Sequence, residues 1–172
     1  MKALIVVDYQ KDFVCGALGF EGAEQYDERI VARIKKAREE GEDVIFTLDT
    51  HDEEYMESME GKHLPVPHCL VNSEGWELYG KVAQCATTQD PVFIKPTFGS
   101  LPLAMHLREQ GYEQVELCGL VSHICVLSNA VLAKSALPNA EIIVDSALTG
   151  SYDESLNQKG FDILRNLHIT VK

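Results

Sequence analysis

The chain has 172 residues, 45% of them hydrophobic and 24% charged, a composition typical of a globular domain that can bury a core. Its 27 acidic residues outnumber 15 basic ones and give a net charge of −12. This excess argues against partners that bind through Lys and Arg, such as nucleic-acid phosphates or an anionic membrane surface. We therefore expect one domain over residues 1–172, with no nucleic-acid and no membrane partner.

Strand-like and helix-like segments alternate along the chain. Residues 3–7 form a continuous apolar run, which is typical of a strand buried on both faces. Residues 23–40 carry apolar side chains at helical spacing among charges, and Gly41 follows as a helix stop. We expect further strands at 44–48, 91–94, 114–117, 141–144 and 168–171, and further helices at 101–109, 124–136 and 153–167.

The alternation predicts a three-layer α/β fold, in which a central six-stranded, mostly parallel sheet is flanked by helices on both sides. The exception is the segment around 50–90, which has weak periodicity and contains Pro65 and Pro67. An irregular stretch of that length usually carries function. We expect it to form an insertion in the domain.

Nothing at the start of the chain predicts export. The apolar run at 3–7 ends at Asp8 and is too short for a signal peptide or a membrane span. The five cysteines form no Cys-x-x-Cys motif, and an odd number of them is more typical of reduced thiols than of a disulfide framework. We therefore expect a cytoplasmic protein, with structural roles for all the cysteines except Cys125.

Polar side chains follow four of the expected strands. Asp8 follows the first strand, Asp49 and then His51 follow the second, Lys95 follows the third, and Cys125 lies at the start of the helix after the fourth. Ligands of open parallel sheets bind beyond the carboxyl ends of the strands, where these residues would meet. Each residue alone also fits a cap, a loop or a core position. Their coincidence at one edge indicates a site.

Cys125 is the candidate nucleophile. The partial positive charge of a helix N-terminus favours a thiolate and can lower a cysteine pKa to roughly 3.5–7.5. Lys95 would add to this effect, whereas Asp8 would oppose it but could accept the thiol proton. The alternative is that Cys125 is a small buried core residue beside Ile124 and Val126.

A second candidate is a metal site. In an extended segment, the Asp-x-His spacing places Asp49 and His51 on the same side. His68 would complete the set, and Glu60 lies between the histidines in sequence. Carboxylate with imidazole suits Zn, Fe or Mn better than Ca. The alternative is that these histidines are ordinary loop residues.

Five separated motifs resemble the isochorismatase-like cysteine hydrolases, and within them the nicotinamidases (pyrazinamidases). The resemblance covers nearly the whole chain and rests on Ala-Leu-Ile-Val-Val-Asp-Tyr-Gln-Lys-Asp-Phe (3–13), Thr-Leu-Asp-Thr-His (47–51), Leu-Pro-Val-Pro-His-Cys-Leu (64–70), Phe-Ile-Lys-Pro-Thr-Phe-Gly-Ser (93–100) and Cys-Gly-Leu-Val-Ser-His-Ile-Cys-Val (118–126). The first, fourth and fifth motifs are similar to those that carry the family's catalytic aspartate, lysine and cysteine. The second and third are similar to its metal-binding segments.

The resemblance implies a thioester mechanism. Asp8 takes the proton of Cys125, the sulfur attacks the amide carbon, and Lys95 stabilises the thiolate and orients Asp8. Backbone N–H groups of Val121 and Cys125 would form the oxyanion hole, and the family often has a cis peptide in this turn, here at Leu120–Val121.

The resemblance also implies a cofactor and a substrate. One divalent ion, Zn first and Fe, Mn or Mg as alternatives, would bind to the four residues Asp49, His51, Glu60 and His68. The substrate would be a small amide, nicotinamide first, with Phe13 and Phe98 as aromatic walls.

Several alternatives stay open at this point. The chain could act on another small amide or carbamoyl compound with the same three catalytic residues, or it could be a catalytically idle family member. Phe13 could equally be a core residue. The sequence does not settle the oligomeric state, although members of the family commonly form homo-oligomers. His123, where relatives often carry Asp or Thr, has no role that the sequence reveals.

Overall fold

A computed structural model describes every residue from Met1 to Lys172. The strands are β1 (Lys2–Val7), β2 (Asp43–Asp49), β3 (Val92–Lys95), β4 (Gln114–Leu120), β5 (Glu141–Gly150) and β6 (Thr170–Val171). The α-helices are α1 (Lys11–Val14), α2 (Tyr26–Glu39), α3 (Met59–His63), α4 (Gly80–Cys85), α5 (Leu101–Gln110), α6 (Leu127–Ala136) and α7 (Glu154–Asn166). Short 3₁₀ turns occur at Ala23–Gln25 and Tyr55–Glu57, and a π-helical turn, Ser122–Val126, precedes α6.

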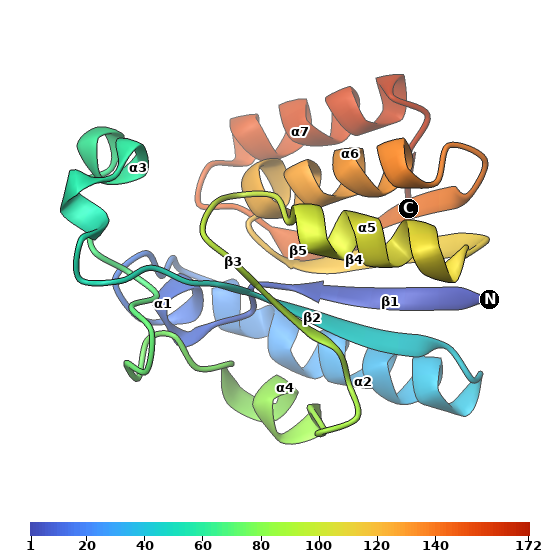
Figure 1. The fold of residues 1–172 in the computed structure, drawn as a ribbon, viewed down its shortest axis with the longest axis horizontal. Helices are drawn as coiled ribbons and strands as arrows, with labels where there is room; N and C mark the ends of the chain where they lie inside the picture. The colour runs from blue at the N-terminus through green and yellow to red at the C-terminus, as the bar shows by residue number, and fades with distance from the viewer.

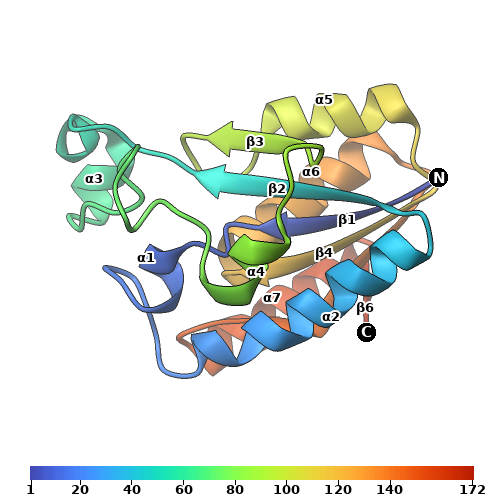
Figure 2. The ribbon, with the colours of Figure 1, turned by 90° about the horizontal axis from the view of Figure 1, so that it is seen from below.

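The strands form one six-stranded sheet in the order β3-β2-β1-β4-β5-β6. Every neighbouring pair is parallel, so the predicted α/β architecture is confirmed and the sheet is wholly parallel. Helices α5, α6 and α7 cover one face, while α2 and α4 cover the other (Figures 1 and 2). The expected three layers are therefore present.

The continuous apolar run of β1 follows from burial on both faces. Leu4 and Val6 belong to the core cluster that packs under α2, whereas Ala3, Ile5 and Val7 belong to the cluster under α5, α6 and α7. Side chains of a strand alternate between the two faces, so a central strand needs apolar residues at every position.

Gly119 allows β4 to pass close to β1 near the carboxyl edge of the sheet. Its φ is +102°, and a Cβ atom added there would lie 2.0 Å from the carbonyl oxygen of Val7. Only glycine fits such an approach, because any side chain would collide with the neighbouring backbone. The expected strand at 114–117 therefore continues through this glycine to Leu120.

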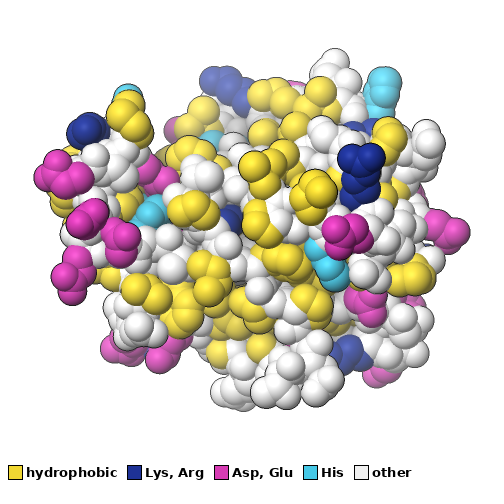
Figure 3. Space-filling view, in the orientation of Figure 1, with side chains coloured by type: hydrophobic (Ala, Val, Ile, Leu, Met, Phe, Trp, Pro, Cys, Tyr) yellow, Lys and Arg dark blue, Asp and Glu magenta, His cyan; other side chains and the backbone are white.

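The segment 50–90 departs from the regular alternation, as expected, but it contains short helices that the sequence pattern did not indicate. Helix α3 protrudes beyond the edge of the sheet, and α4 packs beside α2 (Figures 1 and 2). Exposed carboxylates, which Figure 3 shows gathered around this protrusion, include Asp52, Glu54 and Glu57. None of the helices is both long enough and apolar enough to cross a membrane.

Candidate active site

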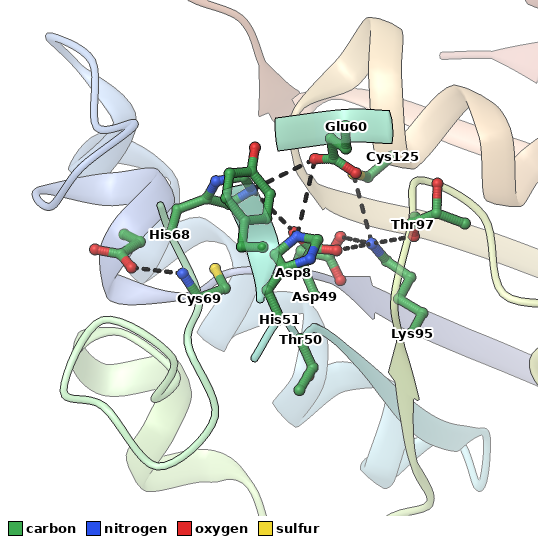
Figure 4. A network of polar contacts seen from close by, with 12 residues as sticks. Asp8, Asp49, Thr50, His51, Glu60, His68, Cys69, Lys95, Thr97 and Cys125 are labelled. Atoms are coloured by element: carbon green, nitrogen blue, oxygen red, sulfur yellow. Dashed lines mark hydrogen bonds and ion pairs between the residues drawn. The ribbon is translucent and has the colours of Figure 1, made fainter. Parts of the chain in front are cut away.

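Three side chains from separate parts of the chain meet at the carboxyl edge of the sheet (Figure 4). Asp8 follows β1, Lys95 ends β3, and Cys125 lies in the π-helical turn after β4. The Lys95 ammonium nitrogen Nζ lies 2.6 Å from Oδ2 of Asp8 and 3.6 Å from Sγ of Cys125. All three residues are buried, so their charges interact with little screening by water. The structure therefore brings together the three residues predicted to be catalytic.

Asp8 is held in an unusual backbone conformation. Its φ is +44°, in the left-handed region that costs a residue other than glycine about 1–3 kcal/mol and that recurs at functional sites. The hydroxyl of Thr47, on the neighbouring strand β2, donates a 2.6 Å hydrogen bond to Oδ1 of Asp8. That bond leaves Oδ2 free to face Lys95. Sequence reasoning missed Thr47, although a hydroxyl inside an otherwise apolar strand was a usable signal.

The ionisation of the three groups differs in one respect from the sequence-based expectation. Burial raises the pKa of the Cys125 thiol well above its usual value, and the charge of Lys95 offsets only part of this effect. The prediction of a lowered thiol pKa is therefore wrong, because Cys125 lies in a buried turn before α6, where burial and the neighbouring carboxylates outweigh the charge of Lys95. Burial also raises the pKa of Asp8, which makes its carboxylate a stronger base.

Lys95 remains an ammonium in this setting. Burial alone would lower its pKa, but the neighbouring carboxylates of Asp8 and Asp49 outweigh burial and raise it. Its Nζ also lies 3.1 Å from Oδ1 of Asp49 and donates to the carbonyl oxygen of Thr97 at 3.0 Å. One fixed cation thus links the base and the thiol to the neighbouring Asp49.

The turn that carries Cys125 has the peptide geometry that the resemblance implied. The bond between Leu120 and Val121 is cis. The carbonyl oxygen of Val121 accepts hydrogen bonds from the N–H groups of Ile124 and Val126, which tightens the turn around Cys125. The assignment of the Val121 and Cys125 N–H groups to an oxyanion hole stays a prediction.

Beside this trio, four side chains form a buried cluster of metal-ligating atoms. One ligand atom from each of four residues lies within 4.8 Å of the others, and the residues are Asp49, His51, Glu60 and His68. The two histidine Nε2 atoms approach Oδ2 of Asp49 at 3.1 and 3.3 Å and Oε1 of Glu60 at 3.8 and 3.6 Å. Two imidazoles and two carboxylates that converge at these distances fit a Zn, Mn or Fe ion.

The candidate ligands are supported by a second layer of contacts. Nδ1 of His68 is 2.8 Å from the carbonyl oxygen of Val66, which leaves Nε2 facing the cluster. The Tyr55 ring packs edge-on against both histidines, and its hydroxyl donates to the carbonyl oxygen of Leu64 at 2.8 Å. These contacts fix the directions in which the imidazole nitrogens point.

Gln10 supports the same cluster from the other side. Its side-chain amide donates to the carbonyl oxygen of Asp49 at 2.9 Å and accepts from the Asp49 N–H at 2.8 Å. Gln10 is fully buried, so these bonds are made without competition from water. Sequence reasoning missed this residue, because a glutamine three positions after a strand is indistinguishable from a turn residue.

A small cavity opens over Sγ of Cys125. Its volume is about 50 Å³, and its walls include Phe13, Phe98, Val121 and residues of the candidate metal cluster. Phe13 is buried and packs edge-on against His68, with the ring centres 5.7 Å apart. Phe98 is 44% exposed and forms the rim. Both predicted aromatic walls therefore line the cavity.

The cavity adjoins a larger apolar vestibule. The vestibule has a volume of about 350 Å³ and shares five wall residues with the inner cavity, among them Leu18, Leu64 and Ile124. None of its wall residues is charged, and the exposed Tyr152 is the wall residue that carries a hydroxyl. An uncharged molecule therefore suits this approach better than a charged one.

Two other residues lie apart from the site. His123 packs edge-on against Tyr152, with ring centres 5.5 Å apart, and does not line the inner cavity. Cys15 is exposed and all five cysteines are free, so the expectation that Cys15 is a structural residue is wrong.

Comparisons with known proteins cover almost the whole chain. The family model described as the isochorismatase domain matches residues 2–171. A Bacillus subtilis (strain 168) protein named as an uncharacterized isochorismatase family protein PncA is 30% identical over 168 residues, covering 89% of this chain and 88% of that protein.

Two crystal structures share the fold over almost the full length of both chains. The nicotinamidase PncA from Bacillus subtilis has a TM-score of 0.87 and 28% identity, with 99% of this chain and 98% of that chain covered. The pyrazinamidase/nicotinamidase from Streptococcus mutans UA159 has a TM-score of 0.89 and 29% identity, with both chains fully covered at 100%.

Proposed function

The chain belongs to the isochorismatase family of hydrolases, and we propose that within it the protein is a metal-dependent cysteine amidohydrolase that converts nicotinamide into nicotinate and ammonia. The observation that carries the proposal is the position of the Lys95 ammonium, which touches both the Cys125 thiol and the Asp8 carboxylate beside a set of four metal-ligating side chains. The two nicotinamidase structures that share the fold support this choice of substrate.

In the first half of the proposed reaction, Asp8 acts as a general base. It takes the proton from Cys125 as the sulfur attacks the amide carbon, so that a C–S bond forms and the carbonyl oxygen becomes negative. Proton transfer during attack suits a thiol whose pKa is raised by burial, because no free thiolate needs to accumulate. Lys95 stabilises the negative charge that passes between sulfur and Asp8.

In the second half, the C–N bond breaks. Asp8 returns its proton to the nitrogen, ammonia leaves, and a thioester links the acyl group to Cys125. Water, activated by the same carboxylate, then attacks the thioester carbon and releases the carboxylic acid product and the free thiol. Backbone N–H groups of Val121 and Cys125 are the proposed donors to the oxyanion in both halves, a role worth roughly 10²–10³ in rate for each donor.

The metal ion would bind through Asp49, His51, Glu60 and His68. A bound divalent ion would supply a Lewis-acidic position for the ring nitrogen of the substrate. Asp49, one of these ligands, pairs with the same Lys95 ammonium as Asp8, so the candidate metal site and the base are linked through one cation.

The substrate assignment is tested by ammonia release with the metal-loaded protein. Nicotinamide is expected to turn over, whereas asparagine and a nicotinamide carrying a ring carboxylate should have kcat/KM values at least about 100-fold lower. The reason is that a charged substituent would lose its hydration in a vestibule that has no charged wall residue. Turnover of another neutral amide without turnover of nicotinamide would overturn the assignment of nicotinamide as the substrate. It would leave the assignment as an amidohydrolase standing.

The ligand assignment predicts a selective loss of metal. His51→Ala removes a donor at the centre of the cluster and is expected to weaken metal affinity by at least about 10–100-fold. The exposed His63, on α3, is the matched control, because His63→Ala removes an imidazole that faces Met59 and not the cluster. Metal content after dialysis against a weak chelator is the measurement. Equal metal content in the His51→Ala variant and the parent protein would refute the assignment.

A further inference from the structure

Asn129 connects the nucleophile turn to the segment that follows the catalytic lysine. It lies in α6, one helical turn after Cys125, and is 1% exposed. Its Nδ2 donates to the carbonyl oxygen of Cys125 at 2.8 Å and to that of Phe98 at 3.1 Å, while its Oδ1 accepts from the N–H of Ser100 at 3.0 Å. One buried amide therefore holds three backbone groups.

Those backbone groups belong to two segments that have no backbone hydrogen bond with each other. Residues 96–100 link the end of β3 to the N-cap of α5, and they contain the rim residue Phe98. Lys95 fixes the start of this segment by donating to the carbonyl oxygen of Thr97. Asn129 fixes its middle and its end. The distance between the Lys95 segment and Cys125 therefore depends on this side chain.

Few side chains other than an amide could make these contacts from α6. They require two N–H donors and one acceptor on a short side chain, which asparagine supplies and leucine, serine and aspartate do not. Leucine has nearly the same shape but would break all three bonds, and the two to Cys125 and Ser100 are buried, where a lost partner costs desolvation. The requirement is for specific bonds and not only for filled space.

We propose that Asn129 is a positioning residue, which sets the place of the Cys125 thiol relative to Lys95 and the Phe98 rim. The inference rests on the proposed function in taking Cys125 as the nucleophile, but not in taking nicotinamide as the substrate. Positioning matters at this site because displacements of about 1 Å at a reacting atom can lower rates by about 100-fold.

The test compares two variants at this position with a matched control. Asn129→Leu removes all three bonds without adding charge, and Asn129→Asp keeps the acceptor but loses both donors. Asn157, another buried asparagine, accepts from the hydroxyl of Ser122 at 2.6 Å and has no bond to Cys125 or to residues 96–100. Asn157→Leu is therefore the control for general loosening around the turn.

The measurements are the rate of alkylation of Cys125 by iodoacetamide, followed by peptide mass spectrometry, and kcat and KM for nicotinamide. Both Asn129 variants are expected to lower the alkylation rate and kcat by about 10–100-fold, with a smaller change in KM. Alkylation of the exposed Cys15 serves as the internal standard and should not change. The Asn157→Leu variant should stay within about 3-fold of the parent protein.

The outcomes separate the two proposals. If Asn129→Leu melts too low for the assay, Asn129→Asp, which keeps the shape and one bond, decides the question. Parent-like alkylation in a folded Asn129 variant, or an equal loss in Asn157→Leu, would overturn the positioning role. If the Asn129 variants lose alkylation at Cys125 but the parent protein does not hydrolyse nicotinamide, the positioning role of Asn129 is supported. Only the assignment of nicotinamide as the substrate is then overturned.

Discussion

Replacement of Cys125 by alanine is expected to lower kcat for nicotinamide by at least about 10⁴-fold, because covalent catalysis has no substitute nucleophile in the cavity. The other walls near the amide carbon are apolar or belong to the candidate metal cluster. The variant should fold, since the exchange removes one small buried atom and leaves the Asp8–Lys95 ion pair intact. Ammonia release and a thermal melt, measured on the same sample, check the two parts of this prediction.

The matched control is Cys15→Ala, which removes an exposed thiol and should retain the activity of the parent protein. A direct readout of the chemistry is also available. Acid quenching of the parent protein during turnover should trap a thioester, seen as the added mass of a nicotinoyl group on the peptide that contains Cys125. If the Cys125→Ala variant still releases ammonia at a rate near that of the parent protein, catalysis at this sulfur is wrong and a metal-bound nucleophile becomes the alternative.

The order of strands and helices was predictable because the sheet is buried on both faces. The apolar runs of β1 and β2 and the amphipathic α2 have periodicities that a sequence reveals directly. The extension of β5 to Gly150 was not predictable, because Asp145 is polar and a register shift opposite Leu117 and Gly119 interrupts the pairing with β4. Helices as short as α3 show no periodicity and form only through tertiary contacts.

The candidate site also contains residues that the sequence predicts and residues that it does not. Asp8, Lys95 and Cys125 were predictable, because parallel strands end at one edge of the sheet and polar residues at those ends converge. Asn129 was not, because its contacts are with a segment far away in sequence. Thr47 gave only the signal of a hydroxyl in an apolar strand, and its contact with Asp8 is also distant in sequence. The raised pKa of the thiol depends on burial, which the sequence alone does not reveal.

Replacement of Lys95 by methionine is expected to lower both the stability and the activity of the protein. Its side chain is fully buried and forms ion pairs with Asp8 at 2.6 Å and with Asp49 at 3.1 Å. Lys95→Met keeps most of the side-chain volume but leaves two carboxylates without their cation. Removing one partner of a buried pair typically costs 3–5 kcal/mol, so the free energy of unfolding should fall by about that amount. The value of kcat should fall by at least about 10²-fold, because the charge on sulfur and Asp8 loses its stabilisation.

A second substitution separates the electrostatic cause from a packing defect. In the double variant Lys95→Met with Asp8→Asn, the uncompensated negative charge at position 8 is gone, while Asp49 keeps its contacts with His51 and His68. Denaturant unfolding should therefore recover about 1–3 kcal/mol of the loss, although activity stays low because the base is absent. If the double variant is no more stable than Lys95→Met alone, misfit of the methionine side chain explains the loss. In that case Lys95 does not act by neutralising Asp8, and the ion pair at the centre of the proposed mechanism has no energetic support.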